Sequence, residues 1–175
     1  GDGWETNAYH QWLKARGKTY TERPHPESEH ITHGPDADDR QTTWCAEMAI
    51  EFMEAKAKSG KPWLFSVNFF DPHHPFDAPE GLLKRYAGCF DDIPLPDYLE
   101  GELEDKPPWQ RRDHLRAYGG YPFAEMSEQD HRLVRASYFA MCDLIDQQVG
   151  RMLDALQRTG QLADTLVIYM SDHGE

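Results

Sequence analysis

Two short, almost wholly apolar segments limit most strongly what this chain can fold into. Residues Pro62–Phe70 are rich in aromatic side chains, and residues Thr165–Met170 combine β-branched and aromatic side chains. Apolar runs of this length, bounded by turn-forming residues, are typical of strands that are buried on both faces of a sheet. A strand, a connecting helix and a second strand assemble most readily as a right-handed parallel crossover. The sequence therefore predicts an α/β fold with a mostly parallel sheet flanked by helices.

A long amphipathic helix is predicted between the two segments. Ser127 is suited to cap its N-terminus, with the acidic Asp130 three residues later, and Gly160 is suited to end it just after Arg158. Apolar side chains recur at steps of three and four, at Val134, Tyr138, Met141, Ile145, Val149, Met152 and Leu156. This spacing predicts one continuous apolar face along the helix.

The remaining segments predict shorter helices and loops. Trp4–Arg16 and Arg40–Lys58 have helical patterns, whereas residues 19–39 and 88–124 lack any periodicity and are expected to be irregular. The length of 175 residues suffices for one domain with a packed core but not for two ordinary domains. We therefore expect residues 1–175 to belong to a single domain.

Each predicted strand ends in a cluster of ionisable side chains. The sequence Asp71-Pro72-His73-His74-Pro75 follows the first strand, and Asp172-His173 follows the second. In open α/β sheets, ligands bind beyond the carboxyl ends of the strands. Parallel pairing would bring both clusters to the same edge, which is where we expect a functional site.

The residue types in these clusters allow two kinds of chemistry. Asp172 and His173 offer an oxygen and a nitrogen donor, which suits a divalent cation, although Asp172 could equally cap a helix that follows. His73 and His74 lie between prolines that restrict the backbone, as suits a catalytic or anion-contacting imidazole. The alternative is that both histidines belong to an ordinary surface loop.

Composition excludes several classes of protein. The formal net charge is −13, which argues against broad binding of nucleic acid. The longest apolar stretch, Trp63–Phe70, falls far short of the roughly 20 residues that a membrane-spanning helix needs. The three cysteines are widely spaced, so the sequence predicts neither a disulfide framework nor a metal site built from cysteine pairs.

Three stretches of the chain resemble the sulfatase family of the alkaline-phosphatase-like superfamily. They are Lys61–Phe76, Tyr138–Leu156 and Asp164–Glu175. The first is similar to the family's strand and Pro-His-x-Pro turn, the second to its long helix, and the third to the strand that carries metal ligands. Their order and spacing extend the resemblance over roughly residues 41–175.

The resemblance implies a role for each candidate residue. Asp172 and His173 match two metal ligands, with Ca²⁺ as the expected cation and Mn²⁺ or Mg²⁺ as alternatives. His73 matches the catalytic histidine that contacts the ester and assists the leaving oxygen. His74 occupies a variable position and is a weaker candidate for contact with the substrate.

The chain also departs from the family pattern. The motif of the nucleophile, a Cys or Ser that becomes formylglycine, is absent, and Cys45, Cys89 and Cys142 have the wrong neighbours for it. The acidic metal-binding pair on the family's first strand is absent as well. We therefore expect residues 1–175 to be an internal part of a sulfatase-like catalytic domain, with formylglycine only in an N-terminal part outside it.

The resemblance implies a function for the parent protein and leaves two alternatives. The leading hypothesis is a metal-dependent sulfuric ester hydrolase that acts on a small-molecule or carbohydrate sulfate ester, with no nucleic acid partner and no membrane span. The first alternative is a phosphonate monoester or phosphodiester hydrolase of the same superfamily. The second is a non-catalytic fragment, because the nucleophile is not encoded in these residues. The sequence indicates no oligomeric state.

Overall fold

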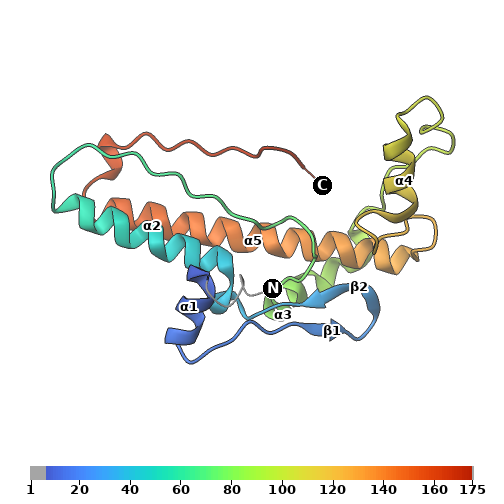
Figure 1. The fold of residues 1–175 in the computed structure, drawn as a ribbon, viewed down its shortest axis with the longest axis horizontal. Helices are drawn as coiled ribbons and strands as arrows, with labels where there is room; N and C mark the ends of the chain where they lie inside the picture. Colours follow the sequence, from blue (N-terminus) through green and yellow to red (C-terminus); the bar gives the residue numbers. More distant parts are fainter. Residues whose placement is uncertain (1–6, 175) are drawn as a thin grey trace.

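Two long helices form the scaffold of the structure, a computed structural model that describes residues 7–174. Helices α2 (Gln41–Ala57) and α5 (Glu128–Arg158) lie side by side and run in the same direction (Figure 1). The capping box at the start of α5 is formed. The Ser127 hydroxyl oxygen accepts a hydrogen bond from the backbone N–H of Asp130, and the Asp130 carboxylate accepts one from the backbone N–H of Ser127. Both predicted helices are confirmed to within one residue at each end.

The apolar core lies along α5 in two parts. One part joins the N-terminal half of α5 to the chain that follows the His73 turn, and it includes Met141 and Leu144, which are fully buried. The other part joins α2 to the C-terminal half of α5 through Ala49, Met53 and Leu156. Each half of α5 therefore packs on a different segment, as its continuous apolar face predicts.

Shorter elements surround the helical pair. They are α1 (Ala8–Ala15), β1 (Arg23–His25), β2 (Ser28–His33), η1 (Ala37–Asp39), α3 (Glu80–Leu83), η2 (Lys84–Asp92), α4 (Pro108–Arg116) and η3 (Leu162–Asp164), where η denotes a 3₁₀ helix. The first residues of the helix expected over Trp4–Arg16 lie outside the described residues. Helix α4 stands on an arm beyond the N-terminal end of α5 (Figure 1). No helix within residues 7–174 is long and apolar enough to cross a membrane.

The expectation that residues 19–39 and 88–124 are irregular is wrong, because β1 and β2 lie in the first range and α4 lies in the second. Strands β1 and β2 pair antiparallel, with Arg23 opposite His33 and a register shift after Pro24. The pattern was missed because β1 is short and polar, so it lacks the apolar alternation that marks a half-buried strand.

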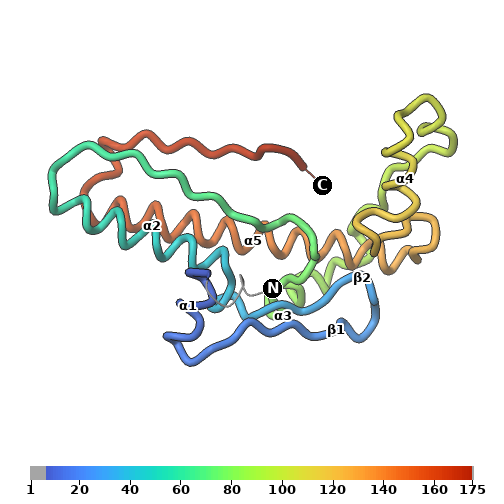
Figure 2. Tube along the Cα trace, viewed as in Figure 1, coloured from blue at the N-terminus to red at the C-terminus, as the bar shows by residue number. Residues whose placement is uncertain are grey.

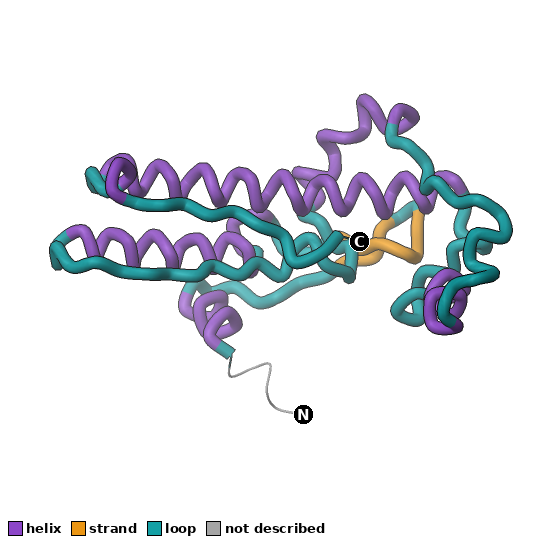
Figure 3. Tube along the Cα trace, turned by 90° about the horizontal axis from the view of Figure 1, so that it is seen from above, coloured by secondary structure: helices purple, strands orange, loops and turns teal. Residues whose placement is uncertain are grey.

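The predicted parallel sheet is not confirmed, because β1 and β2 form the only sheet in the described part of the chain. Residues 61–70 and 165–170 are extended, but no backbone hydrogen bond joins the two segments, so neither forms a ladder. Both segments nevertheless run in the same direction along one side of α2 and α5 (Figures 2 and 3). Their outer side chains have no cover: Leu64 is 94% exposed and Leu166 is 85% exposed.

Arg40, just before α2, binds both ends of the turn that holds the paired histidines. Its Nη2 atom lies 2.6 Å from Oδ1 of Asp71, and its Nη1 atom lies 2.7 Å from Oδ2 of Asp77. The hydroxyl of Thr42 donates to Asp71, and that of Tyr20 donates to Asp77. All three charged side chains are 6% exposed, so these ion pairs are shielded from water. Burial opposes the charge of Arg40, but the two carboxylates outweigh it and raise the pKa of the guanidinium.

Gly34 allows β2 to approach this network closely. Its N–H donates to the Asp77 carbonyl oxygen at 3.0 Å. A Cβ atom at this position would collide with that carbonyl group and with the Arg40 guanidinium. The hairpin therefore reaches the network only because residue 34 has no side chain.

Replacing Arg40 with Met is expected to destabilise the chain by about 3–5 kcal/mol, because Asp71 and Asp77 then remain buried without a cation. The matched control is Arg158→Met, which removes a solvent-exposed pair with Glu54 and should cost less than about 1 kcal/mol. Urea unfolding followed by circular dichroism measures both free energies. Equal small losses for the two variants would contradict a stabilising role for the buried network.

Candidate functional site

His73 lies at the middle of the turn that Asp71 and Asp77 attach to Arg40. Its side chain is partly buried, and its Nδ1 atom lies 2.7 Å from the His74 carbonyl oxygen. A carbonyl oxygen can only accept a hydrogen bond, so Nδ1 carries the proton in this arrangement. In the neutral ring Nε2 is then the basic nitrogen, as a group that exchanges a proton with a substrate requires.

A stack of aromatic rings holds the two histidines from the outside. The ring centroids of His73 and His74 are 4.1 Å apart, and the Tyr118 ring stacks on His74 at 3.4 Å. The Phe70 ring also packs against His73, with centroids 4.8 Å apart. Tyr118 has a backbone φ of +51°, an uncommon conformation for a residue with a side chain. The arm that carries α4 therefore reaches back to the turn through Tyr118.

Asp172 and His173 lie near the end of the other extended segment. Their side chains are 92% and 61% exposed, and their polar atoms bond locally, with the His173 N–H donating to Asp172 Oδ1 at 3.0 Å. Figures 1 and 3 both show the end of this segment beside the turn that follows residue 70. The two extended segments thus end near each other, past the N-terminal end of α2 and over the middle of α5.

The donor atoms of Asp172 and His173 fit a divalent cation in kind, because such ions accept carboxylate oxygen and imidazole nitrogen. The set is incomplete by itself. Residues 7–174 contain no group of three or more His, Cys, Asp or Glu side chains placed to hold a metal ion.

The thiols offer no alternative chemistry at this site. Burial raises the pKa of Cys45 and of Cys142, which keeps both in the unreactive thiol form at neutral pH. Cys89 is exposed, and its thiol lies near the Tyr86 carbonyl oxygen.

The sequence did not single out three residues that shape the turn: Arg40, Asp77 and Tyr118. Arg40 lies 31 and 37 residues from its two carboxylate partners, so no local pattern links them. The only available signal was a pair of acids, Asp71 and Asp77, on either side of the Pro-His-His-Pro sequence. Nothing in the sequence connects Tyr118 with His74.

Comparisons with known proteins extend over most of the chain. A family model described as Sulfatase matches residues 3–175. An uncharacterized sulfatase of Escherichia coli is 33% identical over 143 residues, which cover 78% of this chain and 26% of that protein. A choline-sulfatase of Rhizobium meliloti is 32% identical over 118 residues, which cover 67% of this chain and 22% of that protein.

A solved structure has the same fold over nearly the whole chain. The phosphonate monoester hydrolase SpPMH from Silicibacter pomeroyi superposes with a TM-score of 0.73 at 23% identity, covering 92% of this chain and 35% of that one. The chain therefore spans about a quarter of the length of the two curated relatives and about a third of this structure. The match of the family model over almost every residue shows that the chain belongs to the sulfatase family.

Proposed function

We propose that this chain supplies part of the active site of a metal-dependent hydrolase that cleaves sulfate esters. The observation that carries the proposal is the attachment of the turn that contains His73 to buried Arg40. This turn follows one of two extended segments that run in the same direction (Figure 1). Membership of the sulfatase family supports the same reaction. A small-molecule or carbohydrate sulfate ester is the proposed class of substrate.

His73 is the proposed proton donor to the leaving group. In its protonated form, Nε2 gives a proton to the ester oxygen as the bond between sulfur and that oxygen breaks. The Nδ1–H stays on the His74 carbonyl oxygen and fixes the orientation of the ring. His74 lies between His73 and Tyr118 and is the weaker candidate for contact with the substrate. The nucleophile, a formylglycine, is expected to lie in the part of the complete enzyme that this chain does not span.

Asp172 and His173 are the proposed ligands of a divalent cation, with Ca²⁺ favoured and Mn²⁺ or Mg²⁺ as alternatives. When bound, such an ion stabilises negative charge that develops on the transferred group. The remaining ligands are expected from other parts of the enzyme.

A phosphonate monoester or phosphodiester is the second candidate substrate, favoured by the fold shared with SpPMH. Sulfate and phosphonate esters both present tetrahedral anionic centres, and neither His73 nor the pair Asp172 and His173 distinguishes them by charge. The 175-residue chain alone is expected to have no turnover, because its sequence contains no motif for the nucleophile.

The complete enzyme that contains this chain is expected to hydrolyse 4-nitrophenyl sulfate with a kcat/KM at least about tenfold above that for 4-nitrophenyl phenylphosphonate, a difference of about 1.4 kcal/mol. Release of 4-nitrophenol measures both rates, and the 175-residue chain serves as the inactive control. The reverse preference would favour the phosphonate hydrolase, and absence of turnover on both esters would count against either reaction.

Replacing His73 with Ala in the complete enzyme is expected to lower kcat by about 10²–10⁴-fold, the usual contribution of a general acid. His74→Ala is the matched neighbour and should lower kcat by about tenfold or less, since it removes a packing ring and no proton donor. Steady-state kinetics on an aryl sulfate compares the variants, and equal losses would rule out a distinct role for His73.

Metal content gives a test that does not depend on turnover. The complete enzyme is expected to retain a bound divalent cation through dialysis, and Asp172→Asn should lose it because one anionic ligand is removed. Asp164→Asn, on η3 at the start of the same segment, is the control and should retain the ion. Elemental analysis measures the metal content of the wild type and both variants. Unchanged metal content in Asp172→Asn would exclude Asp172 as a ligand.

A further inference from the structure

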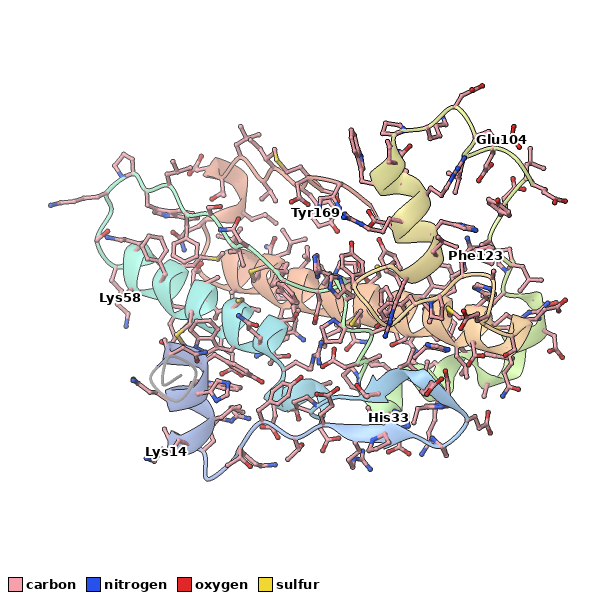
Figure 4. All side chains as sticks on the ribbon, turned by 45° about the vertical axis from the view of Figure 1, so that its right-hand side comes forward. Lys14, His33, Lys58, Glu104, Phe123 and Tyr169 are labelled. Atoms are coloured by element: carbon pink, nitrogen blue, oxygen red, sulfur yellow. The ribbon has the colours of Figure 1, made fainter. Side chains whose placement is uncertain are left out.

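Two histidines pack against each other across the β1–β2 hairpin, away from the segment that carries Asp172 and His173. His25 is the last residue of β1 and His33 the last of β2, and their ring centroids are 4.8 Å apart. Figure 4 shows His33 on the hairpin and Tyr169 on the opposite side of α5, as the ribbon in Figure 1 also does for the two segments. The pair therefore lies outside the candidate site and takes no part in the proposed reaction.

Neither ring can accept a further proton without losing a favourable arrangement. Nδ1 of His25 accepts a hydrogen bond from the Glu27 backbone N–H at 3.2 Å, so Nε2 carries the proton of the neutral ring. A second proton would have to bind Nδ1, where two N–H groups would then point at each other. Nδ1 of His33 is buried and has no hydrogen-bond partner within residues 7–174. The charged form of His33 carries a proton on both nitrogens and would leave a buried N–H without an acceptor.

The charged groups around the pair offer such a proton little compensation. Glu80, on α3, already pairs with two cations, because its carboxylate oxygens lie 2.7 Å from Lys84 Nζ and 3.0 Å from Arg23 Nη2. The other ionisable side chains near His25 line a shallow hollow beside the hairpin and are Glu27, Glu29, His30, Glu125 and Asp130. The three glutamates of this hollow are exposed, so water screens their attraction for a charged ring.

These surroundings favour the neutral form of both histidines. Burial lowers the pKa of His25, and Glu27 and Glu80 oppose it only in part. Burial also lowers the pKa of His33, as do His25 and the two neighbouring cations, against the attraction of Glu80. A histidine whose pKa is lowered by folding binds fewer protons in the folded state. The stability it contributes is therefore complete above the ordinary pKa of about 6.5 and is lost as the pH falls below that value.

The hairpin is bonded directly to the chain that follows His73. The backbone N–H of Thr32 donates to the Phe76 carbonyl oxygen at 3.3 Å, and that of Gly34 donates to the Asp77 carbonyl oxygen at 3.0 Å. The buried histidine of β2 lies between these two donors in the sequence. Displacement of its ring would therefore disturb both bonds to the turn.

We propose that His25 and His33 form an acid-sensitive contact that controls this attachment. While both rings are uncharged, they pack together and hold the hairpin on the chain after His73. Protonation of either ring separates them and opens the two backbone bonds, so that acid loosens the candidate site. Release of the hairpin does not depend on the reaction, whereas its effect on turnover rests on the proposed function.

Hydrogen exchange measured by mass spectrometry on the complete enzyme tests the attachment, at about pH 7.5 and about pH 5. After correction for the direct effect of pH on exchange, the protection of residues 28–36 is expected to fall at least about tenfold in acid. Helix α2 lies outside the hairpin and should keep its protection. An equal loss in α2 would indicate general acid unfolding and would overturn the proposal.

Two substitutions remove the possible charge while preserving the packing. His25→Asn keeps a side-chain acceptor for the Glu27 N–H, and His33→Leu fills the buried position with an apolar side chain. The double variant is expected to keep the same hairpin protection at both pH values, and His25→Asn alone should lose less than the wild type. His10→Gln, on α1, is the control and should lose protection as the wild type does. Thermal unfolding at about pH 7.5 confirms that each variant is folded.

Turnover gives a second measurement. Acid also titrates other groups of the enzyme, so the ratio of kcat in the double variant to kcat in the wild type isolates the effect of the hairpin. This ratio is expected to rise at least about twofold between about pH 7.5 and about pH 5. A constant ratio would overturn control of the site by the hairpin.

The outcomes separate this proposal from the proposed function. The acid-sensitive contact is overturned if the wild-type hairpin keeps its protection at about pH 5, or if the double variant loses protection as the wild type does. Absence of turnover on any ester would overturn only the proposed function, because hydrogen exchange reports on the hairpin without a substrate.

Discussion

The candidate site depends first on one buried cation that binds two carboxylates. Arg40 contacts Asp71 and Asp77, which lie before and after the turn that holds His73. Removing three charges from water carries a large desolvation penalty, and it is offset only when the pairs are short and further hydrogen bonds complete them. Thr42 and Tyr20 supply such bonds. Once the network forms, the backbone on both sides of the turn has little freedom to move.

This constraint explains how a loop can hold a candidate catalytic side chain in place. Loops usually position side chains less sharply than helices or strands do, so a loop site needs support from the residues around it. Here the ends of the turn are attached to Arg40, and the rings of Phe70 and Tyr118 pack against His73 and His74 respectively. The positive φ of Tyr118 fits this account, because strained residues concentrate where surrounding structure fixes a functional geometry.

Features that depend on residues close together in the sequence could be predicted, whereas contacts between residues far apart in the sequence could not. Helix α5 was predicted almost to the residue, because its cap and its apolar spacing are local properties. The sequence also predicted the places and the common direction of the two extended segments. It predicted that they pair in a parallel sheet as well, and this pairing is not confirmed, because no backbone hydrogen bond joins them. The Arg40 network joins residues more than 30 positions apart, and no pattern in a single sequence reports such a contact.

The two halves of the candidate site are therefore fixed to different degrees. The half that carries His73 is tied into the core by buried charge, whereas Asp172 and His173 end a segment with exposed apolar side chains and mainly local hydrogen bonds. Fully burying a side chain such as Leu166 contributes about 1.5–3 kcal/mol, and within residues 7–174 that contribution is not made. Covering the outer face of this segment would stabilise it as a strand. It would also fix Asp172 and His173, the candidate metal ligands, relative to His73, so completing the sheet would set the geometry of the candidate site as well.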